Sequence, residues 1–347
     1  MKKTVLLLSI FGCAILLQGC FYIKQGSYLL KYNASARSVK KIIADPATSQ
    51  ELKDFFNTVD EIRNFAKDSI GLVVNKNYTR FVKIDNDHIA DFVSAAEKLD
   101  FKQYKWCFPI VGCIEYKGYF KRRDADREAA RLSKAGYDVT VEQADAFSTL
   151  GFFPDPLYSY MVKYPLYSLA SLILHEQTHA TIYLKSQAQF NEELASFIGY
   201  EGALSFVKMK FGEQSQQYRD VILRKTERET FLSLINNLVT ELKSIYILKI
   251  SDEEKLIKKE EKIQEFKNFV RDQYDSLFET QRYKGVEKMP INNASLAIWM
   301  TYTKDLQIYY NLYEKCGFSL KKTMELLKNV KTGKDNPKVQ IQKMLNQ

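Results

Sequence analysis

The run His175-Glu176-Gln177-Thr178-His179 is the most informative stretch of this chain and decides the expected fold. Residues four apart share one face of a helix, so His175 and His179 can aim their imidazoles at one point. Two imidazole nitrogens plus a carboxylate make a three-ligand zinc site with a fourth position left for water. Glu176 stands where a carboxylate can take a proton from that water. Because the chain has only three histidines, the pattern weighs against a chance pairing and predicts metal-assisted hydrolysis.

The third ligand is expected to be an acidic residue on a second helix, predicted from about Asn191 to Phe211. On the face of Glu192 every residue is small: Ala195, Ser196, Gly199 and Ala203. On the face of Glu193 most residues are bulky: Ser196, Phe197, Tyr200 and Leu204. Metal–ligand bonds are only about 2 Å long, so the ligand helix must approach the histidine helix closely. We therefore predict Glu192 as the ligand, with Glu201 as the fallback and Glu193 as a solvated neighbour.

The N-terminus is a targeting segment rather than part of the fold. Lys2 and Lys3 precede an apolar stretch from Val5 to Leu17, which has the length of a signal-peptide core and is too short to span a membrane. It ends in Leu17-Gln18-Gly19-Cys20, which looks like the lipobox of a bacterial lipoprotein cleaved before Cys20. The sequence thus predicts a signal peptide over 1–19 and a domain in the cell envelope, attached through lipid on Cys20 to a bilayer and facing the extracytoplasmic side.

Charge and cysteine content narrow the possible partners. The formal net charge of +9 falls to +7 without residues 1–19, and acidic residues are mixed in throughout, so no nucleic-acid site is expected. In an oxidising compartment Cys107 and Cys113, which flank a turn-prone segment, are predicted to form a small-loop disulfide. The competing reading, a second metal site, lacks nearby histidines. Cys316 is expected to be a buried thiol, and nothing in the sequence indicates an oligomeric state.

The expected fold class is α+β, mostly helical, with a small sheet whose edge strand precedes the His175–His179 helix. We predict a single domain over 20–330, made of a sheet-and-helix part (36–160), two motif helices (165–211) and a helical remainder (212–330), followed by a polar, frayed tail (331–347). Ser251 is predicted to cap a helix that reaches about Phe278, and Asn293 to Cys316 is predicted as one further helix. The predicted strands lie within 78–84, 91–96, 107–120 and 137–141, and a helix is predicted over 124–135.

With these residues in view, the chain resembles the predicted aminopeptidase family of bacterial lipoproteins, which carries a zinc-peptidase-like H-E-x-x-H followed by an Asn-Glu pair. The resemblance covers most of the chain after residue 19, and its weakest match is Ile291-Asn292-Asn293-Ala294. The other matching stretches are Glu61–Ala66, Cys107–Cys113, Tyr116–Phe120, Ser148–Pro156, His175–His179 and Phe190–Glu192. The thirteen-residue step from His179 to Glu192 fits the family's spacing. Gln177-Thr178 replaces the more usual Leu-Ala at two positions that bind no metal.

The resemblance implies a zincin-like fold and aminopeptidase activity on a peptide substrate. Zn²⁺ held by His175, His179 and Glu192 would activate water, with Glu176 as general base. By analogy with wider zinc peptidases, the segment Phe147-Ser148-Thr149-Leu150-Gly151 would bind the substrate backbone as an edge strand, or be a simple buried strand. Tyr302 is the candidate that stabilises the oxyanion, and the favoured alternative is that it is one of the chain's many core tyrosines. Asp145 and Glu142 are candidates for binding the substrate's α-ammonium.

Two other classes of function remain open on the sequence alone. The first is a non-catalytic envelope lipoprotein that retains a metal site; Glu176 argues against it, because a structural site gains nothing from a free carboxylate beside the metal. The second is a zinc amidase that acts on cell-wall peptides rather than on proteins. A substrate panel discriminates between this class and a peptidase.

Overall fold

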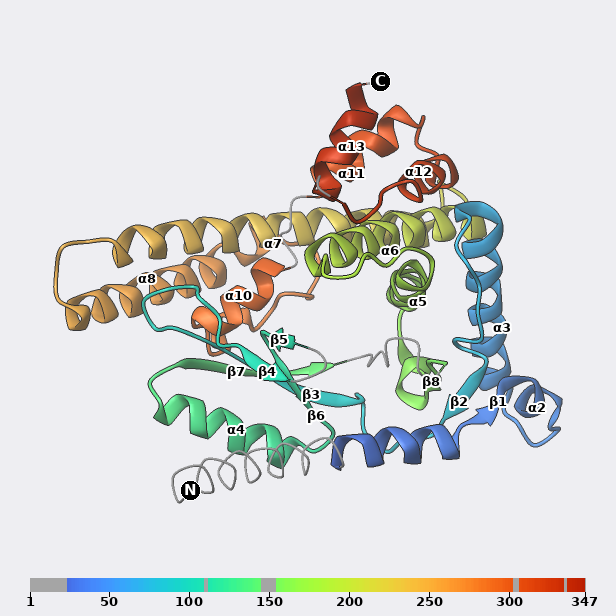
Figure 1. The fold of residues 1–347 in the computed structure, drawn as a ribbon, viewed down its shortest axis with the longest axis horizontal. Helices are drawn as coiled ribbons and strands as arrows, with labels where there is room; N and C mark the ends of the chain where they lie inside the picture. Colours follow the sequence, from blue (N-terminus) through green and yellow to red (C-terminus); the bar gives the residue numbers. More distant parts are fainter. Residues whose placement is uncertain (1–23, 109–111, 145–153, 302–305, 334–335, 347) are drawn as a thin grey trace, which may run out of the picture.

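The two motif helices lie at the centre of the molecule, with one sheet-bearing region below them and helices above (Figure 1). The computed structural model describes residues 24–108, 112–144, 154–301, 306–333 and 336–346. Residues 24–35 are helical. The labelled helices are α2 (Val39–Ala44), α3 (Gln50–Phe65), α4 (Arg122–Lys134), α5 (Leu166–Thr181), α6 (Ala188–Phe211), α7 (Gln216–Tyr246), α8 (Asp252–Asp272), α9 (Tyr274–Leu277), α10 (Asn293–Thr301), α11 (Gln307–Lys315), α12 (Leu320–Leu327) and α13 (Pro337–Asn346).

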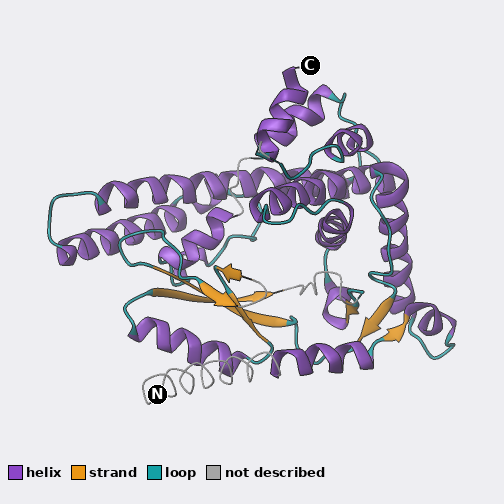
Figure 2. Cartoon of the chain, in the orientation of Figure 1, coloured by secondary structure: helices purple, strands orange, loops and turns teal. Residues whose placement is uncertain are grey.

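The strands are short and form three small sheets (Figure 2). They are β1 (Arg37–Ser38), β2 (Arg80–Val82), β3 (Ala90–Ala96), β4 (Trp106–Phe108), β5 (Gly112–Ile114), β6 (Lys117–Tyr119), β7 (Asp138–Ala144) and β8 (Leu157–Tyr158). The sheet orders are β1-β2-β8, β6-β3-β7 and β4-β5. β7 pairs antiparallel with β3 along its whole length and forms an edge of its sheet. The predicted class, mostly helical α+β with small sheets, is confirmed. The predicted edge strand Phe147–Gly151 lies outside the described residues.

Cys107 and Cys113 face each other across the β4–β5 pair and are joined by a disulfide. Cys316 is a free, half-buried thiol that packs at the edge of the main core. None of the helices in the described ranges is both long and apolar enough to cross a bilayer.

The small face of α6 packs directly on α5. A Cβ added to Gly199 would lie 2.9 Å from the backbone oxygen of Ser171 and 3.3 Å from Cβ of His175. A Cβ on Gly202 would lie 2.8 Å from Cδ1 of Leu174. Real Cβ atoms do not approach other atoms so closely, so these glycines allow the backbones of the two helices to come together. The prediction that the face of Glu192 meets the histidine helix is therefore confirmed.

The Ile291–Ala294 stretch holds the helical part of the molecule to the sheet. Asn293 is fully buried, and its side-chain amide donates to the carbonyl oxygens of Glu97, Lys98 and Asp100. The backbone N–H of Asn293 donates to Asp138 of β7, which also pairs with the buried ammonium of Lys259 on α8. The stretch Ile291–Ala294 thus has a structural role, because it connects the helical part of the molecule to the sheet. The capping of α8 by Ser251 is confirmed, since its side chain and Glu254 form a capping box.

Two predicted boundaries were wrong. The expected helix from Asn293 to Cys316 is two helices in different places, because α10 packs on β3, β7 and α7 whereas α11 packs on α12 and α13. The expected frayed tail contains α13, which buries Pro337 and Ile341 against the main core. The few apolar residues of α13 are enough to hold this helix in place, because they enter a core that the other helices already form.

Candidate active site

α5 begins after Pro165 and presents both histidines of the motif on one face. The Nε2 atoms of His175 and His179 lie 3.2 Å apart, and the two rings meet edge to face. α6 brings Glu192 to the same point: its carboxylate oxygens lie 3.5 Å from Nε2 of His175 and 3.4 Å from Nε2 of His179. The structure therefore brings together all three residues that the sequence predicted as metal ligands.

The spacing of this group is compatible with a single metal ion. Two ligands about 2.05 Å from a tetrahedral ion are separated by about 3.3 Å. Here the two Nε2 atoms lie 3.2 Å apart, one oxygen of Glu192 lies 3.5 Å from Nε2 of His175, and the other lies 3.4 Å from Nε2 of His179. The side chain of Glu192 is 50% exposed, so this side of the group is open to solvent. The group could thus hold a metal ion and still admit water or another molecule.

Burial keeps His179 in the form that a metal requires. Burial and the neighbouring His175 lower the pKa of His179 to about 4, although the charge of Glu192 acts in the opposite direction. His179 is therefore neutral at pH 7 and has a lone pair available for a metal.

Glu176 follows the first histidine and is partly buried beside the ligand group. Burial raises the pKa of Glu176 to about 7; the charge of His175 lowers it, while the carboxylates of Asp155 and Glu192 add to the increase. A carboxyl group with a pKa near 7 can accept and return a proton at neutral pH. Glu176 thus has the protonation behaviour of a general base.

A hydrogen-bonded loop pair lies next to Glu176. The side chain of Asn77 donates to Oδ2 of Asp155 at 3.0 Å and accepts from the backbone N–H of Asp155 at 3.1 Å. The next residue, Tyr78, is buried with a left-handed φ of 61°, which costs a non-glycine residue about 1 kcal/mol or more. Burial and the charges of Glu176 and Asp155 raise the pKa of Tyr78. Sequence reasoning missed this group; the signal available was Asp155 at the end of the Ser148–Pro156 stretch.

Tyr116 is a second residue that sequence reasoning did not assign to the site. It lies between β5 and β6, and its ring packs edge-on against Phe92. Burial and then the carboxylates of Glu192 and Glu176 raise the pKa of Tyr116, so its phenol lies within electrostatic range of both. The available signal was its position at the start of the Tyr116–Phe120 stretch.

Two of the predicted site residues, Glu201 and Glu142, are not part of the metal-ligand group, and several others lie outside the residues that the structure describes. Glu201 accepts hydrogen bonds from Lys225 at 2.8 Å and Tyr310 at 3.1 Å, so the fallback ligand is engaged elsewhere. Glu142 lies on β7 and accepts from Thr140. The predicted residues Cys20, Asp145, Phe147, Ser148, Thr149, Leu150, Gly151 and Tyr302 lie outside the described residues.

The prediction that Glu193 is solvated was wrong. Glu193 is fully buried and points away from the metal ligands, toward the C-terminal helices. Lys338 of α13 lies 3.0 Å from its Oε2, Gln189 donates to Oε1 at 2.8 Å, and Tyr309 of α11 donates to Oε2 at 3.4 Å. A buried carboxylate requires such partners, and two of the three, Tyr309 and Lys338, come from segments far away in the sequence.

Removing the positive partner of Glu193 should destabilise the protein. Lys338→Met leaves a buried carboxylate without its cation, and we expect a loss of up to about 3 kcal/mol in the free energy of unfolding. Adding Glu193→Gln to Lys338→Met removes the uncompensated charge and should recover most of that loss. Denaturant unfolding of the parent, both single variants and the double variant measures this coupling. A double variant as unstable as Lys338→Met would contradict the assignment.

Gln177 is buried inside α5 without hydrogen bonds. Its side chain is fully buried, and neither Oε1 nor Nε2 has a partner among the described residues. The adjacent Thr178, equally buried, donates to the carbonyl oxygen of Leu174 at 2.7 Å. An unsatisfied buried amide costs about 1–3 kcal/mol, so the unusual residue at this position reduces stability.

We expect Gln177→Leu to raise the free energy of unfolding by roughly 1–3 kcal/mol, because an apolar side chain of similar size removes the unpaired amide. Thermal unfolding with zinc content measured in parallel tests this. Thr178→Val is the matched control and should lose about 1 kcal/mol, since it deletes a hydroxyl that is bonded. Destabilisation by Gln177→Leu would show that its amide has a partner.

One of three comparisons with known proteins identifies a family. A family model described as "Putative aminopeptidase" matches residues 20–344. Neither the comparison with curated proteins nor that with solved structures finds a significant match. The family model extends over both motif helices and most of α13. Because it matches nearly the whole chain, the protein belongs to this aminopeptidase family.

Proposed function

We propose that the protein is a zinc metallopeptidase of the aminopeptidase type, tethered to a membrane by lipid on Cys20. The observation that carries the proposal is the metal-ligand group itself: two Nε2 atoms 3.2 Å apart and a carboxylate with oxygens 3.4 and 3.5 Å from them, with Glu176 one residue along the helix from His175. Zinc commonly takes two histidines and one glutamate in catalytic sites, which leave one coordination position open. Family membership supports a peptidase, while the donor set supports zinc.

The residues of the site have two different roles in the proposed hydrolysis. A zinc ion held by His175, His179 and Glu192 would supply a Lewis acid for the scissile carbonyl and lower the pKa of water to about 7. Glu176 takes a proton from the attacking water and passes it to the leaving amine, for which a pKa near 7 is well placed. Two roles thus follow: three side chains bind the ion, and a fourth moves the proton.

A phenol is proposed to donate to the oxyanion. Tyr116 lies in electrostatic range of Glu176 and Glu192, whereas Tyr302 was selected from the sequence. Losing one oxyanion donor commonly lowers kcat about 10²–10³-fold with binding of the metal retained. Comparing Tyr116→Phe with Tyr302→Phe at equal zinc content identifies the donor, and full activity in both variants would exclude both phenols.

Substrate class is tested with the zinc-loaded chain from residue 21 on and a library of peptides with free and blocked N-termini. An aminopeptidase releases single N-terminal residues and ignores blocked peptides. Cleavage of blocked peptides at internal bonds would make the protein an endopeptidase. Hydrolysis restricted to cell-wall peptides would indicate an amidase, and no hydrolysis of any substrate would favour a non-catalytic lipoprotein.

The tether is tested independently of the chemistry. The run Leu17-Gln18-Gly19-Cys20 motivates Cys20→Ser, which should abolish palmitate labelling and release the protein from membranes, or leave the precursor uncleaved. Unchanged palmitate incorporation in this variant would exclude lipid on Cys20 while leaving the peptidase proposal untouched.

A further inference from the structure

The start of the described chain is attached to α4. Lys24 forms an ion pair with Asp124 of α4 at 2.6 Å, and the side chain of Gln25 accepts from the backbone N–H of Phe120 at 3.2 Å. Tyr28 packs its ring on Phe120, with centroids 5.4 Å apart. The helix of residues 24–35 and α4 therefore run along the same edge of the molecule, at the bottom of Figure 1. The C-terminal helices α11–α13 lie at the opposite edge.

This edge carries much of the protein's positive charge. Residues 121–134 contain six cations and three carboxylates, a net charge of +3, and residues 24–35 add two lysines and no acid. These two short segments thus hold a net charge of +5, against +9 for the whole chain. We refer to them together as the basic edge.

The cations on α4 point outward. Ala125 and Leu132 are buried against the sheet, and the residues on the opposite face, spaced by four and seven, are Arg123, Arg127 and Lys134. All three are exposed. Within the ranges that the structure describes, neither Arg123 nor Lys134 forms an ion pair, so their charge is directed to solvent.

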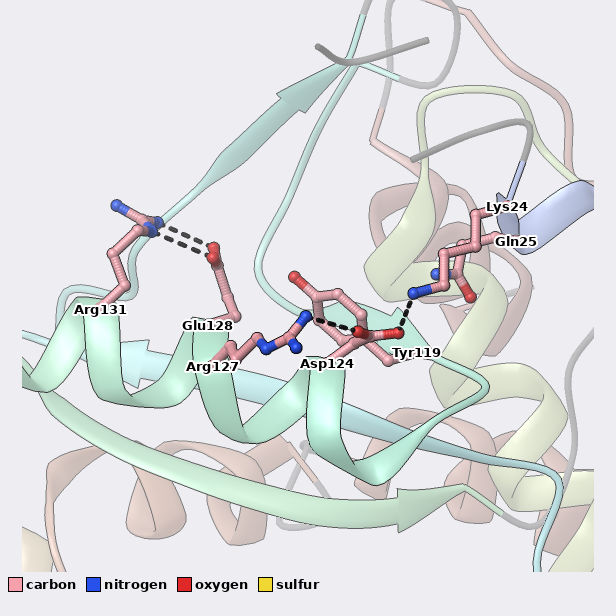
Figure 3. A pocket seen from close by; sticks show the side chains of 7 residues that line it. All are labelled: Lys24, Gln25, Tyr119, Asp124, Arg127, Glu128 and Arg131. Atoms are coloured by element: carbon pink, nitrogen blue, oxygen red, sulfur yellow. Dashed lines mark hydrogen bonds and ion pairs between the residues drawn. The ribbon is translucent and has the colours of Figure 1, made fainter. Parts of the chain in front are cut away.

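A pocket of about 380 Å³ lies between the two segments, but it is not itself the site (Figure 3). Three cations and two carboxylates line it, and they pair with one another: Arg127 lies 3.4 Å from Asp124, and Arg131 lies 2.8 Å from Glu128. Lys24 also pairs with Asp124, so three cations face two carboxylates and the pocket keeps a net charge of only +1. Most of the net charge of +5 on the basic edge therefore lies outside the pocket.

Chain length limits how far this edge can lie from a lipid on Cys20. Four residues span at most about 14 Å when fully extended. An anchor at Cys20 therefore keeps the backbone of Lys24 within about 14 Å of the anchored residue. The ion pair between Lys24 and Asp124 then keeps α4 close to the same point. This short link allows the cations of α4 to approach the headgroups to within the screening length of about 8 Å at physiological salt, where the surface potential of anionic lipids acts.

We propose that the basic edge is a membrane-docking surface for anionic phospholipids, with the outer face of α4 resting on the headgroups; this orientation rests on the proposed tether. In this proposal the lipid on Cys20 attaches the protein to the membrane, and the contact of α4 with the headgroups determines its orientation relative to the bilayer. The metal-ligand helices α5 and α6 lie away from this edge, toward the centre of the molecule (Figure 1). Docking through α4 would therefore leave the ligand group clear of the bilayer.

The test uses the chain from residue 21 on, which has no lipid and keeps every described residue. It is mixed with vesicles of phosphatidylcholine alone or with about 30% phosphatidylglycerol, and the bound fraction is measured by sedimentation. We expect binding to the anionic vesicles only, weakening as salt is raised. The variant Arg123→Gln/Arg127→Gln/Lys134→Gln should bind at least about tenfold more weakly, since each cation near the surface contributes several-fold.

The matched control Lys249→Gln/Lys322→Gln/Lys331→Gln removes the same charge from exposed lysines elsewhere and should bind like the parent. Equal thermal stability of both variants excludes misfolding as the cause. The proposal is overturned if the α4 variant binds like the parent, if the control loses as much binding, or if neutral vesicles bind equally well. The chain from residue 21 on carries no lipid, so its binding to vesicles does not depend on the outcome of palmitate labelling in Cys20→Ser. The docking proposal and the tether proposal can therefore fail independently.

Discussion

Glu192→Ala should lose most of its bound zinc. Three ligands become two, and the remaining imidazoles, with Nε2 atoms 3.2 Å apart, supply only two of the positions around the ion. His179→Ala should do the same for the same reason. Zinc per chain, measured by mass spectrometry after dialysis against buffer of defined free zinc, is expected to fall from near one in the parent to well below half in both variants.

Glu201→Gln is the control for this experiment. Glu201 lies further along the same helix, is also acidic, and is bonded to Lys225 and Tyr310 instead of to the ligand group. It should keep full zinc. If Glu192→Ala retained zinc while Glu201→Gln lost it, the third ligand would be misassigned.

Glu176→Gln should separate metal binding from chemistry. Glu176 is absent from the ligand group, and glutamine keeps the shape of the side chain, so zinc should remain near one per chain. Losing a general base commonly lowers the rate about 10²–10⁴-fold, and here the same carboxyl group also protonates the leaving amine. Turnover of a peptide with a free N-terminus measures this, and hydrolysis at the parent's rate would exclude the proposed mechanism.

The centre of the site could be predicted from the sequence because its signals are local. The spacing of His175 and His179 depends only on helix geometry, and the small face of Glu192 depends only on which residues share a helix face. The structure adds the reason: Gly199 and Gly202 let the two backbones meet. The α+β class was predictable for a similar reason, since strand and helix periods are local patterns.

The remainder was not predictable because it depends on distant partners. Glu193 looks like any exposed helix glutamate until Tyr309, 116 residues further along, and Lys338 are placed beside it. α13 looks like a polar tail until Ile341 enters a core made by other helices. The electrostatic interaction of Tyr116 and Asp155 with Glu176 likewise follows from the packing of loops. No helix or strand pattern predicts it, and the only signal was that both residues lie in stretches that resemble the family.

The most direct test of the account is to remove the metal and restore it. The parent is stripped with a chelator, and zinc is returned in steps while hydrolysis of a free-N-terminus peptide is followed. We expect no hydrolysis in the stripped protein and a linear return of activity that ends at one equivalent of zinc, with no return in Glu192→Ala at the same zinc concentrations. Full activity in the stripped parent, or full restoration of Glu192→Ala, would contradict a peptidase built on His175, His179 and Glu192.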